Sequence, residues 1–161
     1  MNEAEFLEVL RANQGILVKV CTMYCSDFEA QRDLYQEIVL QLWRSFPNFR
    51  KQAKLSTWMY QVALNTAITD YRRSRKQGQR VELSEQFTQI PETSSTVERQ
   101  EKLQWLYRAV ETLSDAEKAI VMLYLDEKSY DEIAEIVGIT PGNVRVKMHR
   151  IQEKLRKLKT D

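Results

Sequence analysis

The pattern Ser-x-x-Glu occurs repeatedly in this chain of 161 residues, each time next to a segment with helical periodicity. In such a capping box the serine hydroxyl accepts a hydrogen bond from a first-turn amide, and the glutamate reaches back to the serine amide. A Thr140-Pro141 pair gives one more helix start, because proline is favoured at the first helical position. These signals predict a chain built from short, capped helices. The expected boxes are Ser26–Glu29, Ser95–Glu98, Ser114–Glu117 and Ser129–Glu132.

The spacing of large apolar residues predicts an all-α fold. Between residues 28 and 46 these residues fall at 34/35, 38/39, 42/43 and 46, which places them on one helix face. No stretch alternates with period two for long. The chain has only four glycines and three prolines, which disfavours a turn-rich β-sandwich. We expect helices over 3–24, 27–45, 55–77, 97–112, 115–126, 130–137 and 141–158.

One segment interrupts the helical pattern. Residues 78–95 are polar and acidic, with Gly78 at the start and Pro91 near the end. This stretch is longer than the usual connection between packed helices, so we interpret it as a flexible linker. The sequence therefore predicts two small helical domains, 1–77 and 96–161, joined by the linker 78–95.

Composition excludes several classes of protein. No apolar run approaches the roughly 18 residues of a membrane span, and the acidic N-terminus lacks the apolar core of a signal peptide. We therefore expect a cytoplasmic protein without membrane insertion. Cys21 and Cys25 are too few for a disulfide framework, and we expect buried free thiols, with redox or metal use as the alternative. Because His149 is the only histidine, we expect no metal site and no cofactor.

The net charge of +1 conceals charge segregated into blocks. Residues 50–80 carry a net charge of +7 and residues 141–161 carry +5, whereas residues 81–101 carry −4 and residues 111–135 carry −6. Each basic block could be a solvated helix face. Two such blocks, each at the end of an amphipathic helix, favour contact with nucleic acid.

The C-terminal segment predicts a helix-turn-helix. Gly138 permits the positive φ of a sharp turn, and Thr140 caps a second helix whose apolar stripe runs from Val144 to Leu158. Such a helix enters the major groove, where asparagine and arginine read bases bidentately and lysines hold phosphates. A plain helical hairpin is the alternative. The candidate base-reading residues are Thr140, Asn143, Arg145, Val146, Lys147, His149 and Arg150, and the candidate phosphate-binding residues are Lys154, Arg156, Lys157 and Lys159.

The helix predicted over 55–77 has two stripes. One should face the core, and its members are Tyr60, Leu64, Ala67, Ile68 and Tyr71. The other is polar and basic, and it contains Trp58, Asn65, Thr69, Arg72 and Lys76. A tryptophan on such a stripe suits stacking on an unpaired base. The alternative, which periodicity alone favours, is that Trp58 covers the edge of the core. Phe49 and Lys54 lie in the preceding loop.

Three segments together resemble the extracytoplasmic-function (ECF) sigma factors of bacterial RNA polymerase. They are DLYQEIVLQLW (33–43), KLSTWMYQVALNTAITDYRR (54–73) and residues 113–158, and the match covers most of the chain. The resemblance implies a two-domain sigma factor that contains the second and fourth conserved regions. It implies a non-catalytic subunit that binds core polymerase and directs promoter-specific transcription initiation.

The resemblance also implies roles for individual residues. Asp33, Gln36, Glu37, Leu40 and Trp43 match the helix that docks on the clamp coiled coil of the largest polymerase subunit. Phe49, Lys54, Trp58, Asn65, Thr69, Arg72 and Arg73 match the positions that capture the melted −10 element. Residues 140–150 match the reader of the duplex −35 element, and the linker matches the segment threaded towards the RNA exit path.

Further partners are implied in the same way: the flap of the second-largest polymerase subunit and an anti-sigma factor. The sequence departs from the family pattern at two positions. Val39 replaces an aromatic residue in the polymerase-binding helix, and Val146 replaces a small polar residue in the recognition helix.

Two other classes of function stay open at this point. One is a stand-alone helix-turn-helix regulator whose N-terminal half senses a signal or dimerises. Such a regulator has no need for the DLYQEIVLQLW motif. The other is an enzyme that uses Asp33 and Glu37 as an acid pair, although no histidine or metal set lies near them in the sequence.

Overall fold

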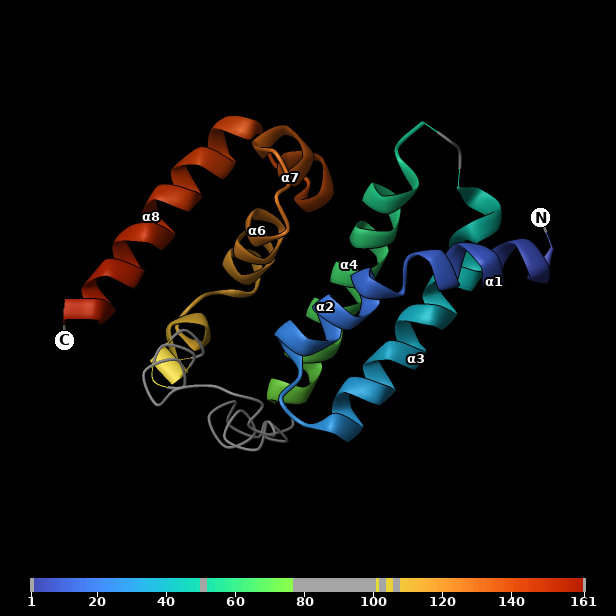
Figure 1. Cartoon of the computed structure of the whole chain (residues 1–161), viewed down its shortest axis with the longest axis horizontal. Coiled ribbons are helices and arrows are strands. Elements are labelled where there is room, and N and C mark those ends of the chain that lie inside the picture. The colour runs from blue at the N-terminus through green and yellow to red at the C-terminus, as the bar shows by residue number, and fades with distance from the viewer. Residues whose placement is uncertain (1, 50–51, 77–100, 102–103, 106–107, 161) are drawn as a thin grey trace. The chain divides into compact units, whose positions relative to one another are not determined.

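The computed structural model describes residues 2–49, 52–76, 101, 104–105 and 108–160. The chain divides into two compact units, Met1–Arg80 and Val81–Asp161. Every regular element in the described ranges is a helix, which confirms the all-α prediction (Figure 1). No helix in these ranges is long and apolar enough to cross a membrane. The predicted linker 78–95 and the expected box Ser95–Glu98 lie outside the described residues.

The first unit is built around three packed helices. These are α2 (Gln14–Tyr24), α3 (Phe28–Ser45) and α4 (Leu55–Lys76), and each packs against the other two. The helix α1 (Glu3–Ala12) precedes them, and a short 3-10 helix, η1 (Phe46–Asn48), follows α3. The core is apolar and fully buried at its centre, where Leu17, Val20, Ile38, Leu42, Ala63 and Ala67 lie.

The predicted single helix over 3–24 is wrong, because the helix breaks at Asn13. The Asn13 side chain donates a hydrogen bond from Nδ2 to the Val9 carbonyl at 2.9 Å, and its backbone leaves the helical region, with φ −125° and ψ 22°. Asparagine competes for backbone partners in this way, and Gly15 nearby is a poor helix former. The separate α1 lies against the unit through Phe6. The Phe6 ring packs edge-on against Trp43 and Phe46, and its centroid lies 5.1 and 5.4 Å from theirs.

The helix caps confirm two of the expected boxes and correct a third. Ser114–Glu117 and Ser129–Glu132 each form both bonds of a capping box. The expected Ser26–Glu29 box is wrong, because Asp27 caps α3 and its Oδ1 accepts a hydrogen bond from the Ala30 amide at 2.6 Å. Aspartate caps as well as serine, and here it stands directly before the first helical residue.

The second unit packs three helices on one another: α6 (Asp115–Leu125), α7 (Tyr130–Val137) and α8 (Pro141–Thr160). Residues 108–111 are also helical, within the helix expected over 97–112. Ile120, Leu123, Ile133, Val144 and Ile151 form the buried centre. The turn between α6 and α7 holds Glu127 at φ 62°, a left-handed conformation that costs a non-glycine residue about 1–2 kcal/mol.

Candidate nucleic-acid and polymerase interfaces

The turn between α7 and α8 has the geometry of a helix-turn-helix. Helix α7 ends at Gly138, whose φ is 83°. The amides of Gly138 and Ile139 both donate to the Ala134 carbonyl, at 2.8 and 3.1 Å. Only glycine adopts this left-handed conformation without a steric cost, so the sequence at 138 permits the sharp exit. The next helix starts at once, since the Thr140 hydroxyl accepts the Asn143 amide hydrogen at 3.2 Å.

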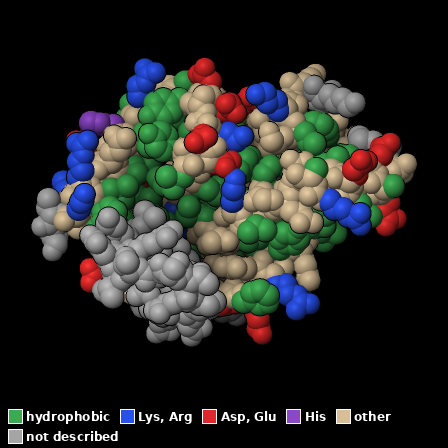
Figure 2. All heavy atoms as spheres, viewed as in Figure 1, with side chains coloured by type: hydrophobic (Ala, Val, Ile, Leu, Met, Phe, Trp, Pro, Cys, Tyr) green, Lys and Arg blue, Asp and Glu red, His purple; other side chains and the backbone are tan. Residues whose placement is uncertain are grey.

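Helix α8 has one buried and one exposed face. Val144, Met148 and Ile151 are buried against the unit. At 100° per residue, Asn143, Val146 and Arg150 point away from that side. The structure therefore exposes the predicted base-reading residues Thr140, Asn143, Arg145, Val146, His149 and Arg150, and leaves Lys147 half-buried. Figure 2 shows Lys and Arg side chains, in blue, along the left-hand edge where α8 lies in Figure 1.

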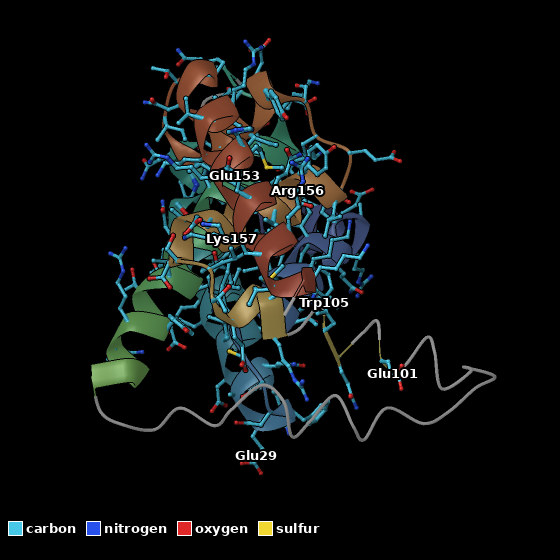
Figure 3. The ribbon with its side chains drawn as sticks, turned by 90° about the vertical axis from the view of Figure 1, so that its left-hand side faces the viewer. Glu29, Glu101, Trp105, Glu153, Arg156 and Lys157 are labelled. Carbon is cyan, nitrogen blue, oxygen red and sulfur yellow. The ribbon has the colours of Figure 1, made fainter. Side chains whose placement is uncertain are left out.

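An acidic residue also lies on the exposed side of α8. Glu153 Oε1 lies 3.4 Å from His149 Nε2, and both side chains are well exposed. Figure 3 shows Glu153 on the same helix as the basic residues Arg156 and Lys157. Because the pair is exposed, it contributes little to the stability of α8.

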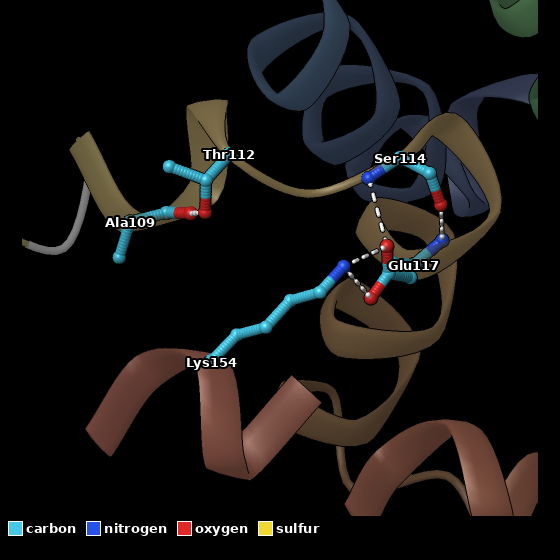
Figure 4. Close-up of polar contacts among 5 residues, drawn as sticks. All are labelled: Ala109, Thr112, Ser114, Glu117 and Lys154. Carbon is cyan, nitrogen blue, oxygen red and sulfur yellow. Dashed lines mark hydrogen bonds and ion pairs between the residues drawn. The ribbon is translucent and has the colours of Figure 1, made fainter. Parts of the chain in front are cut away.

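Lys154, one of the predicted phosphate-binding residues, pairs with an acidic side chain in the folded unit. Its Nζ donates to both carboxylate oxygens of Glu117, at 3.0 Å each. The same carboxylate accepts the Ser114 amide hydrogen at 3.1 Å, as Figure 4 shows. The ammonium group therefore joins α8 to the start of α6, and the phosphate contact of Lys154 stays a prediction. Arg156, Lys157 and Lys159 stay exposed near the end of α8.

The Glu117 carboxyl is tuned by these contacts. Its partial burial alone would raise its pKa. Hydrogen bonds from Ser114 and from Lys154, together with the positive charge of Lys154, outweigh burial and lower the pKa below the usual 4.5. The carboxylate is therefore held in its charged form, in which it accepts bonds from two helices at once.

Trp58 lies in an aromatic cluster at the start of α4. Its ring is 4.9 Å from that of Phe49 and 6.1 Å from that of Phe46. Phe46 is buried, whereas Phe49 and Trp58 are half-buried. Trp58 thus covers the edge of the core, as the alternative interpretation holds, and still keeps part of its ring accessible. Lys54 is exposed directly before α4, and its carbonyl accepts the Trp58 amide hydrogen at 3.1 Å.

The predicted polar stripe of α4 is exposed. Asn65, Thr69, Arg72 and Arg73 all reach solvent, and the Lys76 side chain lies outside the described residues. The Thr69 hydroxyl donates to the Asn65 carbonyl at 2.8 Å, and Arg73 pairs with Asp70 at 2.9 Å. On the other stripe, Tyr60, Leu64, Ala67 and Tyr71 are buried as predicted, whereas Ile68 is only half-buried.

The candidate polymerase-binding residues share one face of α3. Asp33 and Gln36 are exposed, and Glu37 is half-buried and accepts a hydrogen bond from Gln41 Nε2 at 3.0 Å. The same face exposes two large apolar side chains, Leu40 at 40% and Trp43 at 43%. Polar groups around partly exposed apolar ones are the composition of a protein-binding surface.

Comparison with known proteins decides the family. Family models match residues 9–77, as "Sigma-70 region 2", and residues 103–155, as "Sigma-70, region 4". The RNA polymerase sigma factor YlaC of Bacillus subtilis (strain 168) is 31% identical over 143 residues, which cover 80% of this chain and 77% of that protein. This chain belongs to the sigma-70 family, as an ECF sigma factor. The ECF RNA polymerase sigma-E factor of Escherichia coli (strain K12) is 29% identical over 132 residues, which cover 75% of this chain and 69% of that protein.

Two solved structures share the fold. CnrH, in complex with the cytosolic domain of CnrY, has a TM-score of 0.71 at 15% identity, over 98% of this chain and 88% of that one. The sigma factor RpoE, in complex with the anti-sigma factor NepR from Bartonella quintana, has a TM-score of 0.62 at 22% identity, over 98% of this chain and 96% of that one.

Membership of this family fixes the function in outline. The chain is a sigma factor, a non-catalytic subunit that directs promoter-specific initiation by RNA polymerase. This decides against the stand-alone regulator and against the enzyme with an acid pair. No group of three or more His, Cys, Asp or Glu side chains in the part of the chain that the structure describes could hold a metal ion. The first unit holds region 2 and the second holds region 4.

The two cysteines of region 2 are buried free thiols, as predicted. Burial is the main cause that raises the pKa of each thiol to about 12, and the nearby Asp70 carboxylate adds to the effect. Such thiols stay protonated and react slowly near neutral pH.

Several residues that position the interfaces escape sequence reasoning. The bond between Lys154 and Glu117 spans 37 positions, and no local pattern reports so distant a pair. Phe6 lies on a short acidic helix, where the sequence gives no sign that it packs on Trp43. The pair of His149 and Glu153 is the exception, because side chains four residues apart on a helix are neighbours and this spacing could have predicted it.

Proposed function

We propose that this sigma factor docks on the clamp coiled coil of the largest polymerase subunit through the exposed face of α3. It reads the −35 element as duplex with α8, and the −10 element as a melted strand with η1 and α4. The observation that carries the proposal is the face of α3 on which Leu40 and Trp43 remain 40% and 43% exposed. Large apolar groups inside a polar helix face gain free energy when a partner covers them.

The rigidity and polarity of α8 support the proposed reading of a duplex. The left-handed Gly138 and the Lys154–Glu117 bond fix the helix on its unit. Asn143 and Arg150 lie on its exposed face, with donors suited to the base edges of the major groove. Arg145 and Lys147 flank that face, and Arg156, Lys157 and Lys159 supply positive charge for phosphates farther along.

The aromatic cluster at the start of α4 supports the proposed capture of the melted strand. Opening a duplex loses about 1.4 kcal/mol of stacking for each base-pair step. An extruded base that stacks on the accessible part of Trp58 or Phe49 regains some of that energy. Asn65, Thr69, Arg72 and Arg73 extend from this cluster along the exposed stripe of α4, where the strand's phosphates and bases would lie.

Two further partners belong to the proposal. The region 4 unit contacts the flap of the second-largest polymerase subunit, and an anti-sigma factor holds the protein inactive. Support for the second partner comes from RpoE, a structure with the same fold that was solved in complex with an anti-sigma factor.

Docking on polymerase is tested by removing polar and apolar parts of the α3 face together. Gln36→Ala, Glu37→Ala and Leu40→Ala, combined in one variant, should weaken binding to bacterial core RNA polymerase by roughly tenfold or more. Leu40 is used in place of Trp43 because Trp43 also packs on Phe6. Binding is measured by pull-down and by titration of labelled sigma factor.

The matched control carries Glu8→Ala and Thr22→Ala, which change exposed residues on α1 and α2. It should bind like the wild type, and circular dichroism should show both variants to be as helical as the wild type. If the α3 variant binds core polymerase as tightly as the control, the proposed docking face is wrong.

Duplex reading is tested on α8. We expect Arg150→Ala and Arg145→Ala each to weaken recognition of a −35 duplex by about 1–3 kcal/mol, if the arginine makes a bidentate contact to a base. Lys159→Ala is the control, because an exposed lysine at the end of α8 should lose affinity evenly across sequences. The measurement is competition between the −35 duplex and a scrambled duplex for sigma bound to core polymerase. A change in affinity without a change in that ratio would assign both arginines to phosphates.

A further inference from the structure

The exposed face of α8 has an apolar side chain at its centre. Val146 is 50% exposed, and Asn143 and Arg150 lie one turn before and one turn after it on the same face. Valine is a mediocre helix former because its branched side chain loses rotamer freedom, so nothing local favours it at an exposed position. Val146 lies between the two polar side chains that we propose contact bases in the major groove, so a role in DNA recognition is a reason for a valine at this position.

The approach to Val146 is open on its N-terminal side. Helical side chains lean towards the N-terminus, so the valine methyl groups lie over the turn that contains Gly142, four residues earlier. Gly142 has no side chain to cover them. The unit does not need glycine there, since an added Cβ would meet only Thr140 Oγ1, at 4.0 Å. The valine therefore presents an uncovered aliphatic surface near the N-terminal end of α8, the end of a recognition helix that contacts base edges.

The major groove has one apolar group at its base edges, the C5-methyl of thymine. The other groups that distinguish the base pairs there are hydrogen-bond donors and acceptors, and valine can pair with none of them. Burying Val146 against such groups would cost free energy, whereas burying it against a methyl removes apolar surface from water on both sides.

We infer that Val146 is a specificity-determining residue that packs on the methyl group of a thymine in the −35 element. That thymine lies between the bases met by Asn143 and Arg150. The inference rests on the proposed reading of the −35 element by α8. The inference adds that one position of the element must carry a thymine methyl group. The contacts of Asn143 and Arg150 do not set that requirement.

The test removes one methyl group at a time from the DNA. A −35 duplex is first selected from a random library by the sigma factor bound to core polymerase. Each thymine on each strand is then replaced by deoxyuridine, which lacks only the C5-methyl and keeps the base pair. We expect one position at which the wild type loses about three- to fivefold in affinity, the effect of one buried methyl. Val146→Ala, a better helix former, should bind the thymine and deoxyuridine duplexes equally.

Arg150→Ala separates this inference from the function on which it rests. That variant should lose affinity for both duplexes and keep the wild-type ratio between them. If no thymine is sensitive, or if Val146→Ala keeps the full sensitivity, the inference is overturned while the Arg150→Ala loss still supports duplex reading. If the complex selects no −35 sequence, both the inference and the duplex reading by α8 fail.

Discussion

Glu117→Ala is expected to destabilise the region 4 unit by about 2–3 kcal/mol. The substitution removes half of a capping box, worth about 1 kcal/mol, and a charged hydrogen bond between helices, worth about 1–2 kcal/mol because the lysine is 49% exposed. The carboxylate is nearly buried and joins the start of α6 to Lys154 of α8, as Figure 4 shows. Hydrogen–deuterium exchange measures the loss, because it reports the amides of α6 and α8 separately from those of region 2.

Lys154→Ala is the matched variant. Its effect should be smaller, about 1 kcal/mol, since the capping box survives and the lysine side chain is 49% exposed to screening water. In the double variant the two losses should not add, and the difference gives the coupling between the helices. If exchange in α6 and α8 is unchanged in Glu117→Ala, the bond does not hold the recognition helix.

The same carboxylate gives the unit a defined acid sensitivity. The pKa of Glu117 is lower in the folded chain than its usual 4.5. A lowered pKa in the folded state means that the stabilisation is complete above the unfolded value and is lost as pH falls towards the folded value. Stability of the region 4 unit should therefore fall below about pH 4.5 in the wild type, and less steeply in Glu117→Gln.

Local signals in the sequence predict most of the fold. The boxes at Ser114 and Ser129, Gly138 and the Thr140-Pro141 pair define α6, α7 and the start of α8 to within a residue, because caps and glycine turns act over three or four residues. The break at Asn13 was missed for a related reason. A side-chain bond to the Val9 carbonyl ends α1, and asparagine makes that bond or stays helical depending on its surroundings.

The candidate interfaces are predicted less evenly. Which side chains of α8 are exposed follows from periodicity, since Val144, Met148 and Ile151 repeat at helical spacing. What the exposed cations contact does not follow, because that depends on partners far away in the sequence. Lys154 illustrates the limit: its sequence neighbours suggest a phosphate contact, whereas the fold places it on Glu117. Trp58 is a similar case, because periodicity alone could not show that its ring is shared between the core edge and solvent.

Trp58→Ala is expected to impair promoter opening while sparing binding to the −35 duplex. Loss of one stacking contact with a base costs about 1–3 kcal/mol, so affinity for a single-stranded −10 oligonucleotide should fall by about 5- to 150-fold. The proposed −35 contacts lie on α8 of the region 4 unit, whereas Trp58 lies on α4 of the region 2 unit. The measurements are binding of each DNA by sigma bound to core polymerase, and permanganate reactivity of thymines in the −10 element.

The packing of Trp58 requires a control that separates stacking on DNA from support of the core. Phe46→Leu removes the buried ring beside Trp58, at 6.1 Å, and leaves the accessible indole in place. Trp58→Phe keeps an aromatic surface and should retain much of the opening activity. If Phe46→Leu impairs opening as strongly as Trp58→Ala does, the indole acts by supporting the core. Equal losses for the −35 duplex and the −10 strand would contradict the division of labour between α8 and α4.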